Sequence, residues 1–169
     1  MKAVTSTVYE ASELREQHPS GFERALDRYR NTYWDVFGQE SVQDFMRMRA
    51  DQYGFPTSRE FFYDLYGRQA SGFAGGPLTD EEDAALGKVF PDLEGIGVSF
   101  EDGRLVAWGD WDEDGTTYQK EVASEWLDEL YEAMLEAGRD EMDNLESADY
   151  FVEHAELNEW MFEQDGSLR

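Results

Sequence analysis

The sequence predicts an α+β fold, in which several helices pack around a small antiparallel β-sheet. Apolar residues recur every three or four positions in several segments, which is typical of amphipathic helices, and they alternate within residues 96–108, which is typical of a β-hairpin. Hydrophobic residues make up 40% and aromatic residues 15% of the 169-residue chain, so the material for a core is ample. This length predicts a single domain, residues 1–169.

The first 70 residues are expected to form a mainly helical part. Apolar residues such as Phe22, Leu26 and Tyr29 recur at helical spacing, and Thr57 and Ser58 resemble the start of a further helix. The expected elements are a short strand at 3–9, a helical turn from Ser12 that Pro19 ends, helices at 21–37 and 41–53, and a third helix carrying Phe61, Phe62, Leu65 and Tyr66.

Residues 71–169 are expected to form a hairpin and a long helix. The preceding segment, 67–78, holds four Gly and one Pro and predicts a loop. The further expected elements are a helix from Thr79 to Pro91, a hairpin at 96–108 with its turn at 101–103, a strand at 116–120, a helix at 122–143, a short helix from Ser147, and an extended tail that buries Trp160 and Phe162.

Acidic residues are concentrated in the second part of the chain. The whole sequence has 14 Lys and Arg against 39 Asp and Glu, a formal charge of -25. Residues 1–70 hold 9 basic and 11 acidic side chains, whereas residues 71–169 hold 5 and 28. Halophilic adaptation would affect the whole surface, so this asymmetry indicates an interaction surface. The charge disfavours direct binding to nucleic acid or to an anionic membrane and favours a basic partner.

Several functional classes are disfavoured by composition. The absence of Cys excludes disulfides, thiolate metal sites and a Cys nucleophile. The N-terminal residues lack the apolar run of a signal peptide, and no stretch approaches the ~20 apolar residues of a membrane span, so a cytoplasmic protein is expected. His18 and His154 are the only imidazoles, and neither G-x-S-x-G nor H-E-x-x-H occurs. The chain is therefore not expected to be an enzyme.

Two segments resemble a family of small, acidic phage and mobile-element proteins of unassigned role that is sometimes labelled antitoxin-like. The first is VYEASELREQHPSGFERALDRYR, residues 8–30, and the second is WLDELYEAMLEAGRDEMDNLESADYFVEHAELNEWMFEQDGSLR, residues 126–169. Neither contains a catalytic signature, and the middle of the chain departs from the family's Gly-, Ser- and Gln-rich segment. The resemblance implies a phage or prophage origin and favours proteins that disarm host defences.

The helix expected at 122–143 carries carboxylates along one face. With a rise of ~1.5 Å per residue, side chains three or four positions apart lie ~5 to 6 Å apart along the helix. Such a row can imitate the charges of a nucleic-acid backbone and occupy a channel lined by Lys and Arg, although a solvated helix face is the simpler alternative. The candidate partner-binding residues are Glu125, Asp128, Glu129, Glu132, Glu136, Asp140 and Asp143.

We therefore expect a phage-encoded, non-enzymatic inhibitor of a bacterial defence system, such as a restriction or CRISPR complex. Its partner would be a basic nucleic-acid-binding protein of that complex, and DNA or RNA could be the molecule imitated. One alternative is an antitoxin-like protein that neutralises a basic toxin. It would use the same attraction between opposite charges, but its target would differ. Inhibition through an allosteric contact of the Arg- and Tyr-rich first third is a further alternative.

A second candidate site is the segment DWDEDGTTYQKE, residues 110–121, which fits the template of a calcium-binding loop. Asp110, Asp112 and Asp114 stand at the first, third and fifth positions, and Glu121 stands at the twelfth. The preceding segment is expected to be a strand rather than the helix of an EF-hand. A solvated acidic turn is the simpler alternative, and calcium is the one cofactor that the sequence indicates.

Overall fold

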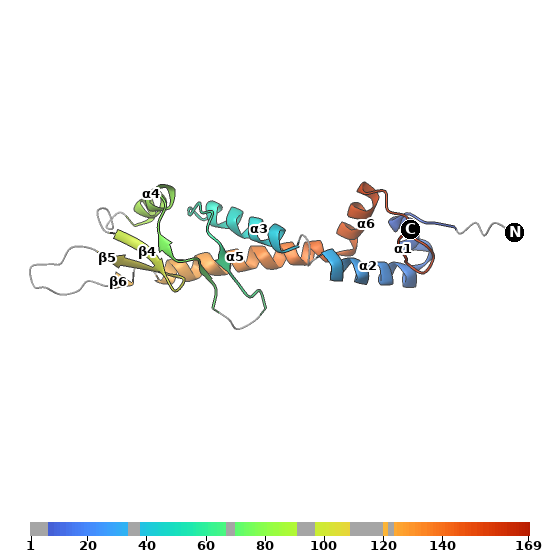
Figure 1. The fold of residues 1–169 in the computed structure, drawn as a ribbon, viewed down its shortest axis with the longest axis horizontal. Helices are drawn as coiled ribbons and strands as arrows, with labels where there is room; N and C mark the ends of the chain where they lie inside the picture. Colours follow the sequence, from blue (N-terminus) through green and yellow to red (C-terminus); the bar gives the residue numbers. More distant parts are fainter. Residues whose placement is uncertain (1–6, 34–37, 67–69, 91–96, 109–119, 122–123) are drawn as a thin grey trace, which may run out of the picture. The chain divides into compact units, whose positions relative to one another are not determined.

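The computed structural model describes residues 7–33, 38–66, 70–90, 97–108, 120–121 and 124–169 (Figure 1). These residues form an α+β fold, which confirms the predicted fold class. The chain divides into two compact units, one formed by Met1–Ser41 with Asp140–Arg169 and the other by Val42–Arg139. The division expected at residue 70 falls inside the second unit, and the single domain stays a prediction.

Three helices and the C-terminal segment build the first unit. The helices are α1 (Ala11–Gln17), α2 (Pro19–Tyr33) and α6 (Ala148–Leu157), and each contacts the other two. Ser147 caps α6 by accepting a hydrogen bond from the backbone N–H of Tyr150 at 3.1 Å. The core side chains are Leu14, Phe22, Leu26, Tyr29, Phe151 and Phe162.

The C-terminal segment closes this core through backbone contacts. Phe162 exchanges two hydrogen bonds of 2.9 Å with Tyr9, and it also forms a bridge to Leu168. Gly21 at the start of α2 lies so close to the segment that an added Cβ would meet the backbone oxygen of Gln164. Phe162 is buried as expected, whereas Trp160 is only half-buried.

Two small antiparallel sheets lie in the second unit (Figure 1). The first pairs β1 (Phe61–Phe62) with β2 (Gly72–Phe73). The second has the order β3-β4-β5-β6. Its strands are β3 (Gly76–Pro77), β4 (Gly97–Glu101), β5 (Arg104–Trp108) and β6 (Lys120–Glu121). Asp102 and Gly103 take positive φ angles of 51° and 77° in the β4–β5 turn, which confirms the predicted hairpin.

The helices of the second unit pack around these sheets. They are α4 (Asp80–Val89) and most of α3 (Gln39–Gln52) and α5 (Ser124–Leu145). One boundary between the units falls inside α3, after Ser41, and the other falls inside α5, after Arg139. The rings of Phe73 and Tyr131 lie 5.4 Å apart, so the apolar face of α5 reaches the sheet residues. The largest buried side chains here are Met46, Phe55, Phe61, Phe73, Leu86, Phe100, Leu105, Leu130 and Met134.

The prediction of a helix from Thr57 through Tyr66 is wrong. Phe61 and Phe62 form β1 instead, and their burial alternates, with Phe61 1% and Phe62 54% exposed. Phe61 packs against Phe73 with their ring centroids 5.1 Å apart. The expected loop at 67–78 correspondingly contains β2 and β3. Tertiary packing therefore overrides the local pattern.

The remaining helices and the β4–β5 hairpin agree with the sequence wherever the structure describes them. α1, α2, α3, α4, α5 and α6 stand at the expected places, with ends that differ by a few residues. The strand predicted at 3–9 is not formed in its described residues, 7–9, where only Tyr9 pairs with Phe162 in an isolated bridge. Residues 3–6 of that strand, residues 34–37 of the second helix and residues 116–119 of the last strand lie outside the described residues.

We predict that Gly21→Ala lowers the free energy of unfolding by about 1–3 kcal/mol, because the new methyl group collides with backbone rather than with a flexible side chain. Gly87→Ala in α4 is the matched control, since a Cβ there meets nothing within 4 Å and Ala favours a helix by up to ~1 kcal/mol. Urea denaturation of both variants measures the two effects. Equal stability of the Gly21 variant and the wild type would contradict the close backbone approach.

Candidate functional site

All seven carboxylates predicted as partner-binding residues lie exposed on α5. Five belong to the part of α5 in the second unit, and we call these residues the acidic stripe. At 3.6 residues per turn they cover an arc of roughly 100° around the helix, opposite the buried residues Leu127, Leu130 and Met134. The acidic stripe consists of Glu125, Asp128, Glu129, Glu132 and Glu136.

The spacing of the acidic stripe approaches that of a nucleic-acid strand. Glu125 and Glu136 are separated by eleven residues, or about 16 Å of helix rise. Five charges over this length give one charge per ~4 Å, compared with ~3.4 Å per phosphate along one strand of B-DNA. The acidic stripe therefore carries nearly the linear charge density of a single strand.

Two neighbouring side chains fix parts of the acidic stripe. Arg139 forms an ion pair with Glu132 at 2.9 Å, and its Nε donates to the backbone oxygen of Leu65, also at 2.9 Å. The hydroxyl of Tyr53, the residue that follows α3, donates to Glu129 at 2.8 Å. This hydrogen bond raises the pKa of Tyr53, so the phenol stays protonated as the donor. Glu129 and Glu132 are thus held in place while remaining exposed.

The remaining two candidates, Asp140 and Asp143, belong to the first unit. Between them stands Glu141, which is only 6% exposed and which the sequence analysis missed. Its Oε1 accepts a hydrogen bond of 2.7 Å from the hydroxyl of Ser41. Glu141 falls on the apolar side of the helical repeat, and this position is the sequence signal that could have identified it.

Acidity is shared by both compact units. The first unit carries 17 acidic and 6 basic side chains, and the second carries 22 and 8. Their formal charges are therefore -11 and -14, with His neutral. The contrast between residues 1–70 and 71–169 does not separate a neutral unit from an acidic one, because each unit combines segments from both parts.

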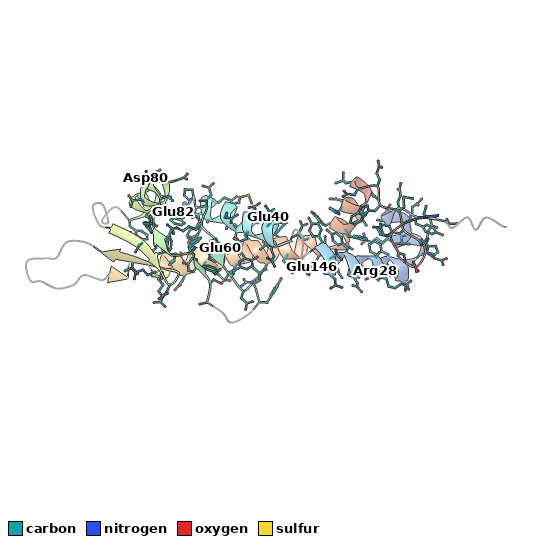
Figure 2. The ribbon with its side chains drawn as sticks, viewed as in Figure 1. Arg28, Glu40, Glu60, Asp80, Glu82 and Glu146 are labelled. Carbon is teal, nitrogen blue, oxygen red and sulfur yellow. The ribbon has the colours of Figure 1, made fainter. Side chains whose placement is uncertain are left out.

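The sequence analysis also missed a buried ion pair in the second unit. The Arg59 side chain is 11% exposed and the Glu82 side chain 1%, and they meet through hydrogen bonds of 2.8, 2.9 and 3.0 Å. Figure 2 labels Glu82 on α4. Thr57 donates to the same carboxylate at 2.5 Å, and the backbone N–H of Thr79 donates at 3.0 Å. Both oxygens of Glu82 are therefore well supplied with donors.

The guanidinium of Arg59 also contacts two backbone oxygens and an aromatic ring. Nη1 donates to the backbone oxygen of Ala74 at 3.0 Å, and Nη2 donates to that of Pro77. The guanidinium carbon also lies 5.1 Å from the centre of the Phe100 ring. Burial raises the pKa of Glu82, but the hydrogen bonds from Arg59, Thr57 and Thr79 and the charge of Arg59 outweigh it, so the net shift is downward.

The predicted calcium loop falls mainly outside the described residues. Asp110, Asp112 and Asp114 are not described, and only the backbone pairing of Glu121 with Val106 is. Within the described ranges, no group of three or more His, Asp or Glu residues is placed to hold a metal ion. Calcium binding by this loop stays a prediction. Among the described helices, none is long and apolar enough to cross a membrane.

We predict that Glu82→Gln lowers the free energy of unfolding by roughly 3 kcal/mol or more near neutral pH, because Arg59 is left buried without its counter-charge. Since the pKa of Glu82 is lowered from 4.5, its contribution is complete above that pH and is lost on further acidification. The difference from the wild type should therefore shrink below pH 4.5 in urea titrations. Glu81→Gln, at the exposed neighbouring position, is the control and should stay within about 0.5 kcal/mol. A difference independent of pH would contradict a charged Glu82.

The calcium hypothesis predicts a higher melting temperature in millimolar calcium, because a ligand that binds only the folded protein stabilises it. Asp112→Asn combined with Asp114→Asn should abolish the increase by removing two ligand charges. Melting curves with calcium, with magnesium and with a chelator measure the effect. An unchanged melting temperature of the wild type in calcium would rule out the site.

Searches with protein-family models, with curated proteins and with solved structures found no match to this chain. The function must therefore be argued from the chain's own residues. The strongest features for that argument are the acidic stripe on α5 and its two fixed carboxylates, Glu129 and Glu132.

Proposed function

We propose that this protein is a phage-encoded, non-enzymatic inhibitor of a bacterial defence complex, such as a restriction or CRISPR complex, in the host cytoplasm. It presents the acidic stripe as a substitute for a nucleic-acid strand and occupies a basic groove of the complex. The observation that carries this proposal is the linear charge density of the acidic stripe, which is close to that of a DNA strand.

Local helix stability does not account for the acidic stripe. Carboxylates in the first turn of a helix interact favourably with its dipole, and this explains Asp80, Glu81 and Asp83 at the start of α4. On α5 only Glu125 lies in the first turn, whereas Glu136 lies three turns further on. Like charges three or four residues apart cost about 0.2–0.5 kcal/mol per pair. A binding function gives a reason for keeping these charges.

Packing anchors the helix that carries the acidic stripe. A Cβ on Gly138 would collide with side chains of Met46 and Leu65, so α5 packs tightly on neighbouring residues of the second unit. The buried residues Leu130 and Met134 anchor the opposite face of α5. A rigid decoy loses little conformational entropy on binding, and this favours affinity.

Electrostatic attraction would drive the binding of the acidic stripe to a basic groove. A groove that binds nucleic acid concentrates anions near its Lys and Arg side chains, and a row of fixed carboxylates releases these ions when it enters. Long-range attraction also raises the rate of encounter. Both effects are screened by salt, so inhibition should weaken steeply as ionic strength increases.

The test compares two variants with the same charge change. The stripe variant carries Glu125→Gln, Asp128→Asn, Glu129→Gln and Glu136→Gln, and it keeps the ion pair of Glu132 with Arg139. The control variant carries four changes to Gln at exposed positions of the first unit, namely Glu16, Glu23, Glu153 and Glu156. Both variants have a formal charge of -21 instead of -25.

We predict that the wild type and the control variant restore phage plating on hosts that carry a restriction or CRISPR system, and that the stripe variant loses about tenfold or more in potency. With the purified complex, the inhibition constant should rise with salt for the wild type and less steeply for the stripe variant. Labelled DNA and RNA competitors identify the molecule imitated. The proposal is contradicted if the wild type inhibits no restriction or CRISPR system, or if the stripe variant and the control variant are equally potent.

A further inference from the structure

The number of charges in the acidic stripe matches one nucleic-acid strand better than a duplex. Double-stranded DNA has one negative charge per ~1.7 Å of its axis, because both strands contribute, whereas each strand alone has one per ~3.4 Å. Over the ~16 Å of helix rise between Glu125 and Glu136, a duplex therefore presents about ten phosphates and a single strand about five. The acidic stripe has five carboxylates, which is the number expected for a single strand.

The helix beside α5 adds no second row of charges. α3 packs on α5 within the second unit, since a Cβ on Gly138 would meet the side chain of Met46 (Figure 1). Residues 42–52 of α3 hold two acidic and two basic side chains, so this part of the helix is formally neutral. One acidic residue of this part, Asp44, is paired with Arg47 at 3.1 Å. The carboxylates of α5 therefore form a single row beside a neutral helix.

An aromatic ring lies against one of the fixed carboxylates. The ring of Tyr53 packs on Trp126 of α5 with their centroids 6.0 Å apart, and its hydroxyl donates to Glu129 at 2.8 Å. The residue is half-buried, so part of it remains accessible to a partner. The acidic stripe thus borders on an aromatic side chain at Glu129.

A more exposed ring stands near the other fixed carboxylate. Arg139 connects Glu132 to the segment after β1, because it pairs with Glu132 and donates to the backbone oxygen of Leu65, both at 2.9 Å. Tyr66 is the next residue of this segment, and it is 68% exposed. Its ring is therefore available to a partner that contacts the acidic stripe and has a surface for aromatic stacking.

Grooves that bind single strands use two kinds of contact. Lys and Arg side chains follow the phosphates, and aromatic side chains stack on the bases, whose faces are open in a single strand. In a duplex the bases are paired, and proteins read only their edges in the grooves. A row of carboxylates with an exposed ring nearby provides a counterpart for both contacts of a single-strand groove. A groove that binds duplex DNA has a use for the charges alone.

We propose that the groove occupied by this protein is one that binds a single strand, in which the acidic stripe replaces the phosphates and Tyr66 replaces an unstacked base. This inference rests on the function proposed above for the acidic stripe, and it narrows the partner to a protein that binds single-stranded DNA or RNA. A protein that binds only duplex DNA is not a partner.

Three purified probe proteins test this preference. The first is an oligonucleotide-binding-fold protein loaded with fluorescent oligo-dT, the second is a cold-shock domain loaded with oligo-U, and the third is a basic protein loaded with duplex DNA. The salt concentration is chosen so that each probe holds its oligonucleotide with the same affinity. Fluorescence anisotropy then measures the release of the oligonucleotide. We predict that the wild type releases at least one of the single strands at a tenfold or more lower concentration than the duplex. The comparison of the first two probes shows whether DNA or RNA is imitated.

Three single substitutions test the role of Tyr66. Tyr66→Ala should weaken the release of the single strand by about fivefold or more, the effect expected from the loss of one stacking contact. Tyr66→Phe keeps the ring and should act like the wild type. Met48→Ala removes another exposed apolar side chain, which lies beside Pro56 and Thr79, and should also act like the wild type. None of these changes alters the charge, so the salt dependence should remain that of the wild type, whereas the stripe variant should lose most of it.

Three results would overturn the inference. They are release of the duplex as readily as of the single strands, release of neither single strand, and an unaffected Tyr66→Ala variant. Tyr66 is exposed, so its variants should keep the melting temperature of the wild type, and thermal melting checks this. If the wild type releases single strands but inhibits no restriction or CRISPR system, only the proposed target fails. If it inhibits such a system but releases duplex DNA equally well, only this inference fails.

Discussion

The ion pair of Arg59 with Glu82 is the interaction on which the second unit depends. Arg59 reaches the backbone around β3, and Glu82 connects the start of α4 to Thr57. Burying two charges is expensive unless hydrogen bonds replace the lost water. Here the guanidinium and the carboxylate are both extensively hydrogen-bonded, so the pair joins three segments of the chain. The short strands β1, β2 and β3 can persist because side chains hold their ends.

This constraint also bears on the candidate interface. The sheet residue Phe100 lies next to Arg59, and Phe73 contacts both Phe100 and Tyr131. Tyr131 is on α5, and in sequence it stands between Glu129 and Glu132 of the acidic stripe. The apolar face of α5 is therefore anchored by a core that the ion pair closes. Repulsion among the exposed carboxylates is opposed by this packing and not by salt bridges alone.

The sequence predicted those features that depend on local patterns. The apolar repeat located α2 and α5, the turn residues located the β4–β5 hairpin, and Thr79 marked the start of α4. The exposed side of α5 also followed from its repeat. The segment from Thr57 was predicted wrongly because its structure depends on residues far away in the chain: Thr57 binds Glu82 rather than capping a helix. Likewise, periodicity predicts that Tyr29 is buried but not which hydrogen bonds its hydroxyl makes.

The order of the two units along the chain has a consequence for biosynthesis. The second unit is one continuous stretch, whereas the first is assembled from two segments that flank it. Once residues 42–139 have left the ribosome, all residues of the second unit are available for folding. Phe22 and Leu26 on α2, in contrast, must wait for Phe151 and Phe162 before their core can form. The core of nascent α1 and α2 therefore remains incomplete until Phe151 and Phe162 have been synthesised, so the inserted unit can fold before it although α1 and α2 are synthesised earlier.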